Sequence, residues 1–264
     1  MPGHVRAHRR DSRPVSPLEA IAILAAGLAA GTINTIVGSG SLITFPTLLA
    51  FGYAPVVANV SNTVGLVPGS LSGAIGYRRE LAGQRGRAIR LGIAAVAGGL
   101  TGGLLLLALP AAAFEWIVPI LILGAVVLMA IQPRLSRAMG ERRAEGQEHT
   151  LPLFITIYLT GIYGGYFGAA QGVIMMALLA TFLPEHLQRL NALKNVLAML
   201  INGVAAILFI AVAPVAWAPA ILLAIGAIVG GQIGAIVGRR LPAGVLRLAI
   251  IVLGTFVGIR LLLG

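Results

Sequence analysis

Long apolar stretches separated by short polar turns fill the chain from about residue 17 to its end. A helix that crosses the hydrocarbon core of a bilayer needs about 20 mainly apolar residues, and eight stretches approach or exceed that length. Two others, 41–51 and 172–183, would cover only about 16 to 18 Å as helices, which predicts half-helices or re-entrant segments. The pattern predicts an all-α, polytopic membrane helix bundle. The long stretches run near 17–37, 55–77, 88–109, 112–131, 151–168, 189–212, 216–238 and 243–263.

Each short stretch follows a polar interruption of the chain. Gly38, Ser39, Gly40 and Ser41 precede the first, and residues 168–172 precede the second. Non-helical backbone persists inside a membrane only where protein or a water-filled cavity satisfies it. Backbone N–H groups at a helix N-terminus also attract anions, with the positive end of the helix dipole. The interruptions therefore predict an anion-binding site, although small residues that only let helices pack closely are an alternative.

The order long, short, long, long, long occurs twice, which indicates an internal duplication. Gly31 and Gly38 align with Gly161 and Gly168, and a further three-residue shift aligns Asn62 with Asn195. We predict four parts: a basic tail 1–16, a first repeat 17–131, a basic cytoplasmic linker 132–150 and a second repeat 151–264.

Loop charge indicates how the two repeats are oriented. The basic loop 78–90 corresponds to the neutral loop 212–217, and the neutral loop 109–112 corresponds to the basic pair at 239–240. Basic loops favour the cytoplasmic side, so corresponding loops face opposite sides if all five segments of each repeat cross. This favours inverted repeats. With full crossing, however, the tail would lie outside despite its four arginines. If the short segments only dip in and return, the tail would be cytoplasmic, but the basic pair at 239–240 would lie outside.

Composition excludes an ordinary soluble protein. Hydrophobic residues make up 58% of the 264 and charged residues 10%, against roughly 25% charged in soluble domains. The net charge of +11 lies in loops between apolar stretches, which is typical of contact with anionic lipid and not with nucleic acid. There is no cysteine, no His/Asp/Glu cluster with metal spacing, and no base beside a nucleophilic serine. We therefore predict no enzyme activity, no metal site and no cofactor.

Polar side chains inside the apolar stretches are the candidate binding residues. Lys194 is the only lysine, and burying it costs about 3 kcal/mol on insertion scales; a lysine that reaches the interface instead is the alternative. Asn191 and Asn195 share a helix face beside it. These residues could bind an oxyanion, or they could make ordinary interhelical hydrogen bonds of about 0.6 kcal/mol each. The matching polar residues of the first repeat are Asn59, Ser61, Asn62 and Thr63.

Other residues receive simpler interpretations. Glu185 lies in a predicted solvated turn, and Glu115 beside Trp116 is predicted to be interfacial. Small residues at one helix face permit close contact within a chain or between chains, so a homo-oligomer is possible. The glycines with that spacing are Gly226, Gly230, Gly231 and Gly234.

Motifs in both repeats resemble the sulfite exporter TauE/SafE family. The resemblance covers nearly all of residues 17–264 and implies a multi-pass permease of the bacterial inner membrane, built of duplicated bundles, for small sulfur-containing anions. The second break departs from the glycine-rich pattern, because Ala169-Ala170-Gln171 stands there; if both breaks bind substrate, Gln171 would act through its side chain. The motifs are Gly38-Ser-Gly-Ser-Leu-Ile-Thr-Phe-Pro46, Ala58-Asn-Val-Ser-Asn-Thr-Val64, Gly76-Tyr-Arg-Arg-Glu80, Tyr163-Gly-Gly-Tyr-Phe-Gly168 and Asn191-Ala-Leu-Lys-Asn195.

We therefore predict a secondary transporter for a small oxyanion that works by alternating access. The family resemblance implies sulfite, thiosulfate or an organosulfonate such as sulfoacetate as the substrate. The substrate would be held by the N-termini of 41–51 and 172–183, neutralised by Lys194 and oriented by the polar residues of both repeats. An anion channel and a non-transporting membrane scaffold are the alternatives.

Overall fold

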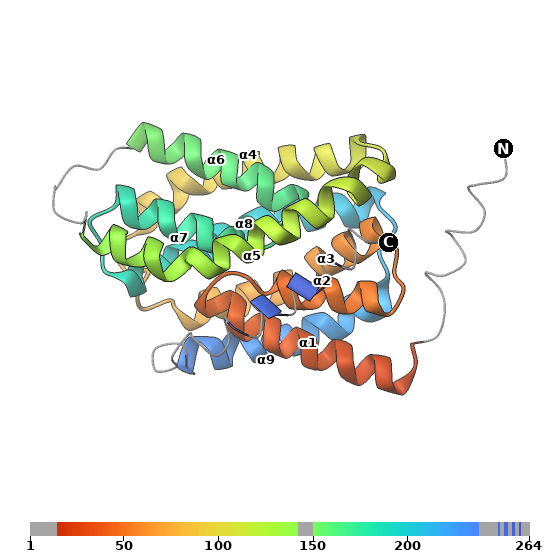
Figure 1. Cartoon of the computed structure of the whole chain (residues 1–264). Helices are drawn as coiled ribbons and strands as arrows, with labels where there is room; N and C mark the ends of the chain where they lie inside the picture. Colours follow the sequence, from red (N-terminus) through yellow and green to blue (C-terminus); the bar gives the residue numbers. More distant parts are fainter. Residues whose placement is uncertain are drawn as a thin grey trace.

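The computed structural model describes residues 15–141 and 150–237 and six positions between 248 and 259. Within these ranges every regular element is an α-helix, and there are nine (Figure 1). Proline at the first position and the Ser16 hydroxyl, which accepts from the Glu19 N–H, start the first helix. The helices are α1 Pro17–Ile36, α2 Ser41–Ala50, α3 Pro55–Gly76, α4 Arg85–Ala108, α5 Ala111–Glu141, α6 Thr150–Tyr166, α7 Gln171–Phe182, α8 Leu187–Val212 and α9 Trp217–Val237.

The two short helices, α2 and α7, form where the sequence predicts them, with 10 and 12 residues. The largest difference in a boundary is at α5, which continues to Glu141, so the predicted linker 132–150 begins as helix. Arginine, methionine and glutamate are good helix formers, and a helix does not have to end where its apolar stretch ends. The predicted last span, 243–263, lies largely outside the described residues.

Five described helices are long and apolar enough to cross a membrane: α1, α4, α5 over Ala111–Ile131, α8 and α9. Two other predicted spans are not among them. The helix α6 has 17 residues, and α3 has 22 but carries Asn59, Ser61, Asn62 and other polar residues on an interior face. The large apolar side chains on the outside, such as Trp116 at 81% exposure, suit contact with lipid.

The helices pack in matching pairs, each with one helix from either half of the chain. In Figure 1, α1 and α9 lie together at one side of the bundle, and α4 and α6 lie together at the opposite side. Between them α3 packs on α9, α8 packs on α4, and α3 contacts α8. Glycines allow this proximity, because a Cβ at Gly31 would overlap the Ala227 backbone and one at Gly98 would overlap the Tyr158 carbonyl.

The sequence did not decide whether the small residues of α9 serve a contact within the chain or between chains. The four glycines lie against other helices of the same chain. Gly226 and Gly230 face the backbone of α1 near Leu24 and Leu28. Gly234 lies in the same interface, against Thr32 of α1, whereas Gly231 lies against Gly69 of α3.

Candidate functional site where the two chain breaks cross

The first helix of each half ends in the same way. Gly38 and Gly168 have φ angles of 88° and 75°, a conformation that glycine adopts without steric cost. Their N–H groups donate to the carbonyls of Ile33 and Tyr163, in both cases over 3.1 Å. Corresponding residues are 130 positions apart, which is the alignment predicted from the sequence.

The two breaks lie against each other. The Gly172 N–H donates to the Gly38 carbonyl over 3.0 Å, and a Cβ on either glycine would overlap the backbone of the other. The predicted meeting of two distant polar interruptions is therefore confirmed. In the second break Ala170 takes the left-handed conformation, with φ 57°.

The N-terminus of α2 presents hydrogen-bond donors at this crossing. The first backbone hydrogen bonds here come from Leu42 and Ile43, so the N–H groups of Ser39, Gly40 and Ser41 donate to no described backbone carbonyl. The Ser39 side chain is 1% exposed, and its hydroxyl has no described partner. The positive end of the helix dipole adds to these donors, so this helix end suits an anion.

The N-terminus of α7 differs because more of its donors are used. The Gly172 N–H is bonded to Gly38, and the Gln171 N–H donates to the Gly168 carbonyl over 3.3 Å. The Gln171 side chain donates to Asn202 Oδ1 over 3.1 Å, while its own buried Oε1 has no described partner. The two breaks are thus unequal, and the α2 end has more available donors.

Asn62 of α3 fixes the start of α2. Its Nδ2 donates to Ser41 Oγ over 3.2 Å, and its Oδ1 accepts from the Thr44 hydroxyl. Asn62 therefore lies beside the candidate anion site and orients the Ser41 hydroxyl.

Lys194, Asn191 and Asn195 of α8 converge on the C-terminal end of α1. The lysine Nζ lies 3.2 Å from the Asn34 carbonyl and 3.4 Å from the Thr35 carbonyl. Both asparagine Nδ2 atoms donate to that same Thr35 carbonyl, over 3.2 and 3.3 Å. The last carbonyls of a helix carry partial negative charge, so they stabilise the ammonium.

Lys194 is 1% exposed. The alternative of a lysine that reaches the membrane interface is therefore wrong. No described carboxylate pairs with its ammonium. Thr35, whose carbonyl the ammonium contacts, lies four residues before Ser39 along the chain.

Asn59 of α3 makes the corresponding hydrogen bond from the first half of the chain to the second. Its Nδ2 donates over 2.9 Å to the carbonyl of Tyr166, the last residue of α6. The third helix of each half thus caps the first helix of the other half. Ser61 has a separate role, because its hydroxyl accepts from the Ala216 N–H over 2.8 Å, just before α9.

Two polar features were missed or misplaced by sequence reasoning. Glu19 is buried and accepts from the Tyr53 hydroxyl over 3.0 Å; the capping pattern Ser16-x-x-Glu19 was the available indication. Glu115, which was predicted to be interfacial, is exposed.

The second of these residues is Glu185, which was predicted to be solvated but forms two ion pairs. Its carboxylate pairs with Arg87 over 2.9 Å and with Arg189 over 2.8 Å, joining the start of α4 to the turn before α8. Partial burial would raise the pKa of Glu185, but hydrogen bonds and charges from Arg189 and Arg87 outweigh it and lower the pKa. Arg189 also donates to the Ala82 carbonyl.

Comparison with known proteins decides the family. The sequence model described as Sulfite exporter TauE/SafE matches residues 23–261. The chain belongs to this family. With its apolar helices, the TauE/SafE member is a multi-pass membrane protein of the transporter class and not an enzyme.

Several bacterial relatives align over most of this TauE/SafE chain. It is 28% identical over 219 residues to the "Probable membrane transporter protein YfcA" of Escherichia coli K12, covering 83% of this chain and 80% of the relative. A "Probable membrane transporter protein" of Haemophilus influenzae is 28% identical over 216 residues, covering 81% and 84%. The "Probable membrane transporter protein ORF9" of a Sinorhizobium species is 25% identical over 240 residues, covering 91% of each. No solved structure matches.

Proposed function

We propose that this protein is a secondary transporter of small sulfur-containing oxyanions in the bacterial inner membrane, and that it works by alternating access. Sulfite, thiosulfate and organosulfonates such as sulfoacetate are the candidate substrates. The family supports the substrate class, and the N-terminus of α2 supplies the observation that carries the proposal.

At that helix end, three backbone N–H groups and one buried hydroxyl have no described backbone or side-chain acceptor. Buried polar groups in native proteins are nearly always hydrogen-bonded, so the donors left over at the buried residues Ser39 and Gly40 favour a ligand that accepts. The half-buried Ser41 lies next to them. A sulfite or sulfonate group offers three oxygens to them. A scaffold whose polar residues only pack together would have satisfied these groups internally.

Lys194 would supply the positive charge. Its ammonium has three hydrogens, and the described structure provides acceptors at the Asn34 and Thr35 carbonyls. Opposite charges attract strongly where water is excluded. The lysine would therefore favour an anion at the crossing while also stabilising the end of α1.

The helix arrangement supports inverted repeats that cross the membrane completely. The α1–α9 pair corresponds to the α6–α4 pair, and α3–α9 corresponds to α8–α4, as a two-fold relation requires. The Arg87–Glu185 ion pair also favours α4 beginning on the side where α7 ends. A re-entrant α7 would put these ends on opposite sides.

Two serines allow a matched test. Ser39 and Ser61 are both buried to 1% exposure or less, but the Ser39 hydroxyl has no described partner and the Ser61 hydroxyl holds the Ala216 N–H. We expect Ser39→Ala to raise the KM for labelled sulfite or sulfoacetate counter-flow about tenfold, because one hydrogen bond to a charged group is worth about 1.5 to 3 kcal/mol. Ser61→Ala should leave the KM unchanged and lower only the Tm.

Lys194→Gln tests the charge in the same proteoliposomes. Glutamine keeps an N–H donor for the end of α1 but has no charge, so exchange should fall by tenfold or more in a folded protein. Wild-type KM values in both Ser39→Ala and Lys194→Gln would reject the site. Currents that scale with voltage and show neither saturation nor exchange would indicate an anion channel instead.

A further inference from the structure

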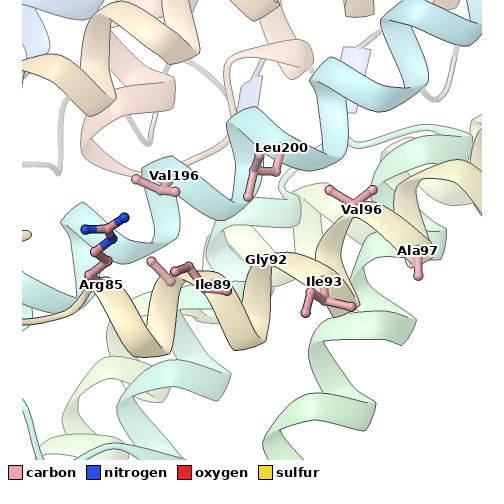
Figure 2. A pocket seen from close by; sticks show the side chains of 9 residues that line it. Arg85, Ile89, Gly92, Ile93, Val96, Ala97, Val196 and Leu200 are labelled. Carbon is pink, nitrogen blue, oxygen red and sulfur yellow. The ribbon is translucent and has the colours of Figure 1, made fainter.

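An open groove runs along the outside of the bundle between α4 and α8. It has a volume of about 610 Å³. Figure 2 shows its walls, which are almost entirely hydrocarbon, with Arg85 at one end. The lining residues include Ile89, Ile93 and Val96 of α4 and Val196 and Leu200 of α8.

A glycine creates the middle of this groove. Gly92 lies between Ile89 and Ile93 on the same helix, and a Cβ there would approach the Leu200 side chain to 3.0 Å. A larger residue would fill the space between the two helices. This small position therefore helps to keep the groove open.

The groove has the length of one lipid leaflet. Twelve residues separate Arg85 from Ala97 at its other end, a rise of about 18 Å at 1.5 Å per residue. Half of a hydrocarbon core about 30 Å thick is about 15 Å. A single acyl chain could thus lie along it from the interface towards the middle of the bilayer.

Its charged end is suited to a phosphate. Arg85 is exposed at the first position of α4, where the helix dipole is positive. It has no described ion-pair or hydrogen-bond partner, whereas the nearby Arg87 and Arg189 are both held by Glu185. The guanidinium of Arg85 is therefore available, and its planar set of donors fits phosphate oxygens.

From this combination we propose that the α4–α8 groove is a binding site for an anionic phospholipid. One acyl chain lies against Gly92, Ile93 and Leu200, and the headgroup phosphate contacts Arg85. The site is separate from the crossing of the chain breaks and does not depend on the transport activity.

Native mass spectrometry of the full-length protein, purified from mixed micelles of phosphatidylglycerol and phosphatidylcholine, tests the site. The wild-type protein should retain phosphatidylglycerol in preference. Arg85→Gln should weaken that retention about fivefold, as expected for one basic residue at an anionic headgroup. Arg90→Gln, an exposed arginine on α4 that does not line the groove, is the matched control and should behave as wild type.

A bulky residue tests the acyl chain. Ala97 is exposed at the inner end of the groove, so Ala97→Phe should abolish retention of both lipids, whereas Leu104→Phe, outside the groove on the same helix, should not. Equal effects of Arg85→Gln and Arg90→Gln would overturn the proposal. Displacement of the lipid by soluble glycerol phosphate at matched concentration would also overturn it, because that result indicates a phosphate site alone. A lipid-free dimer that Ala97→Phe dissociates would overturn it as well, because that result indicates a second copy in the groove.

Discussion

Gly38 meets two steric demands at once. Its φ of 88° lies in the region that side chains disfavour, and its α-carbon lies against the backbone of Gly172. Gly52 shares only the first demand, because its φ is 84° but nothing lies within 4 Å of the place a Cβ would take. Substitutions at Gly38 and Gly52 therefore separate the free-energy cost of the left-handed backbone conformation from the cost of steric overlap.

We expect Gly52→Ala to lower the free energy of unfolding by about 1 to 2 kcal/mol, the cost of a left-handed alanine. Gly38→Ala should cost clearly more, because the two breaks must also move apart. Thermal unfolding of both variants in the same detergent measures the difference. Equal Tm values for the two would show that the breaks do not press against each other in the membrane.

Buried serines show what a sequence does not reveal at this scale. Ser39 and Ser61 are the same residue type, both are predicted site residues, and both are buried. Only the structure shows that Ser61 accepts from the Ala216 N–H and that Ser39 has no described partner. Hydropathy and spacing give the position of a hydroxyl along the chain, but its partner comes from a residue 155 positions away.

At the scale of elements, helix ends are stabilised by the other half of the molecule. The end of α1 receives three donors from α8, and the end of α6 receives Asn59 of α3. The last four carbonyls of a helix lack partners within it, and leaving them bare inside a membrane is costly. These hydrogen bonds between the two halves remove that cost and fix the positions of the two breaks relative to each other.

The start of α4 and the α7–α8 turn are also joined across the halves, by Glu185. Its pKa is lowered in the folded protein by Arg189 and Arg87, so its stabilisation is present above the pKa of the unfolded state, about 4.3. It disappears as the pH falls through the lower folded-state pKa. The ion pairs of Glu185 with Arg87 and Arg189 therefore stabilise the folded protein at neutral pH.

We expect Glu185→Gln to lower the free energy of unfolding by about 1 kcal/mol at pH 7, the upper range for exposed pairs. The difference from wild type should vanish at a pH below the folded-state pKa. Unfolding in detergent across this pH range measures it, with Glu115→Gln, an exposed acid on α5, as the control. A difference that persists unchanged in acid would mean that the charge of Glu185 is not what matters.

At the scale of the whole molecule, the α1–α9 and α4–α6 pairs lie on opposite sides of the bundle (Figure 1). Each pair includes one of the two helices that end at a break, α1 or α6. Inverted repeats give two related bundles that can move against each other around a central site. The chain has no cysteine, so single cysteines can report the side on which each turn lies.

Complete crossing by the short helices predicts that Arg79→Cys and His186→Cys are labelled from the cytoplasm only. Leu109→Cys and Pro214→Cys should react from outside with a membrane-impermeant maleimide in intact cells. All four positions are exposed in turns or at helix ends. Labelling of Arg79→Cys and His186→Cys from opposite sides would contradict inverted, fully crossing repeats.

The sequence by itself determined the helical membrane class, the two short helices and the 130-residue correspondence of the breaks, because apolar length and glycine placement act locally along the chain. It also identified Lys194 and the asparagines as the polar residues of the interior. Only the tertiary structure decided that Lys194, Asn191 and Asn195 meet the end of α1, that Asn59 meets the end of α6, and that α2 keeps more free donors than α7. The hydrogen bonds at the ends of α1 and α6 join residues more than 100 positions apart. They depend on how glycine-lined helices from the two halves pack together.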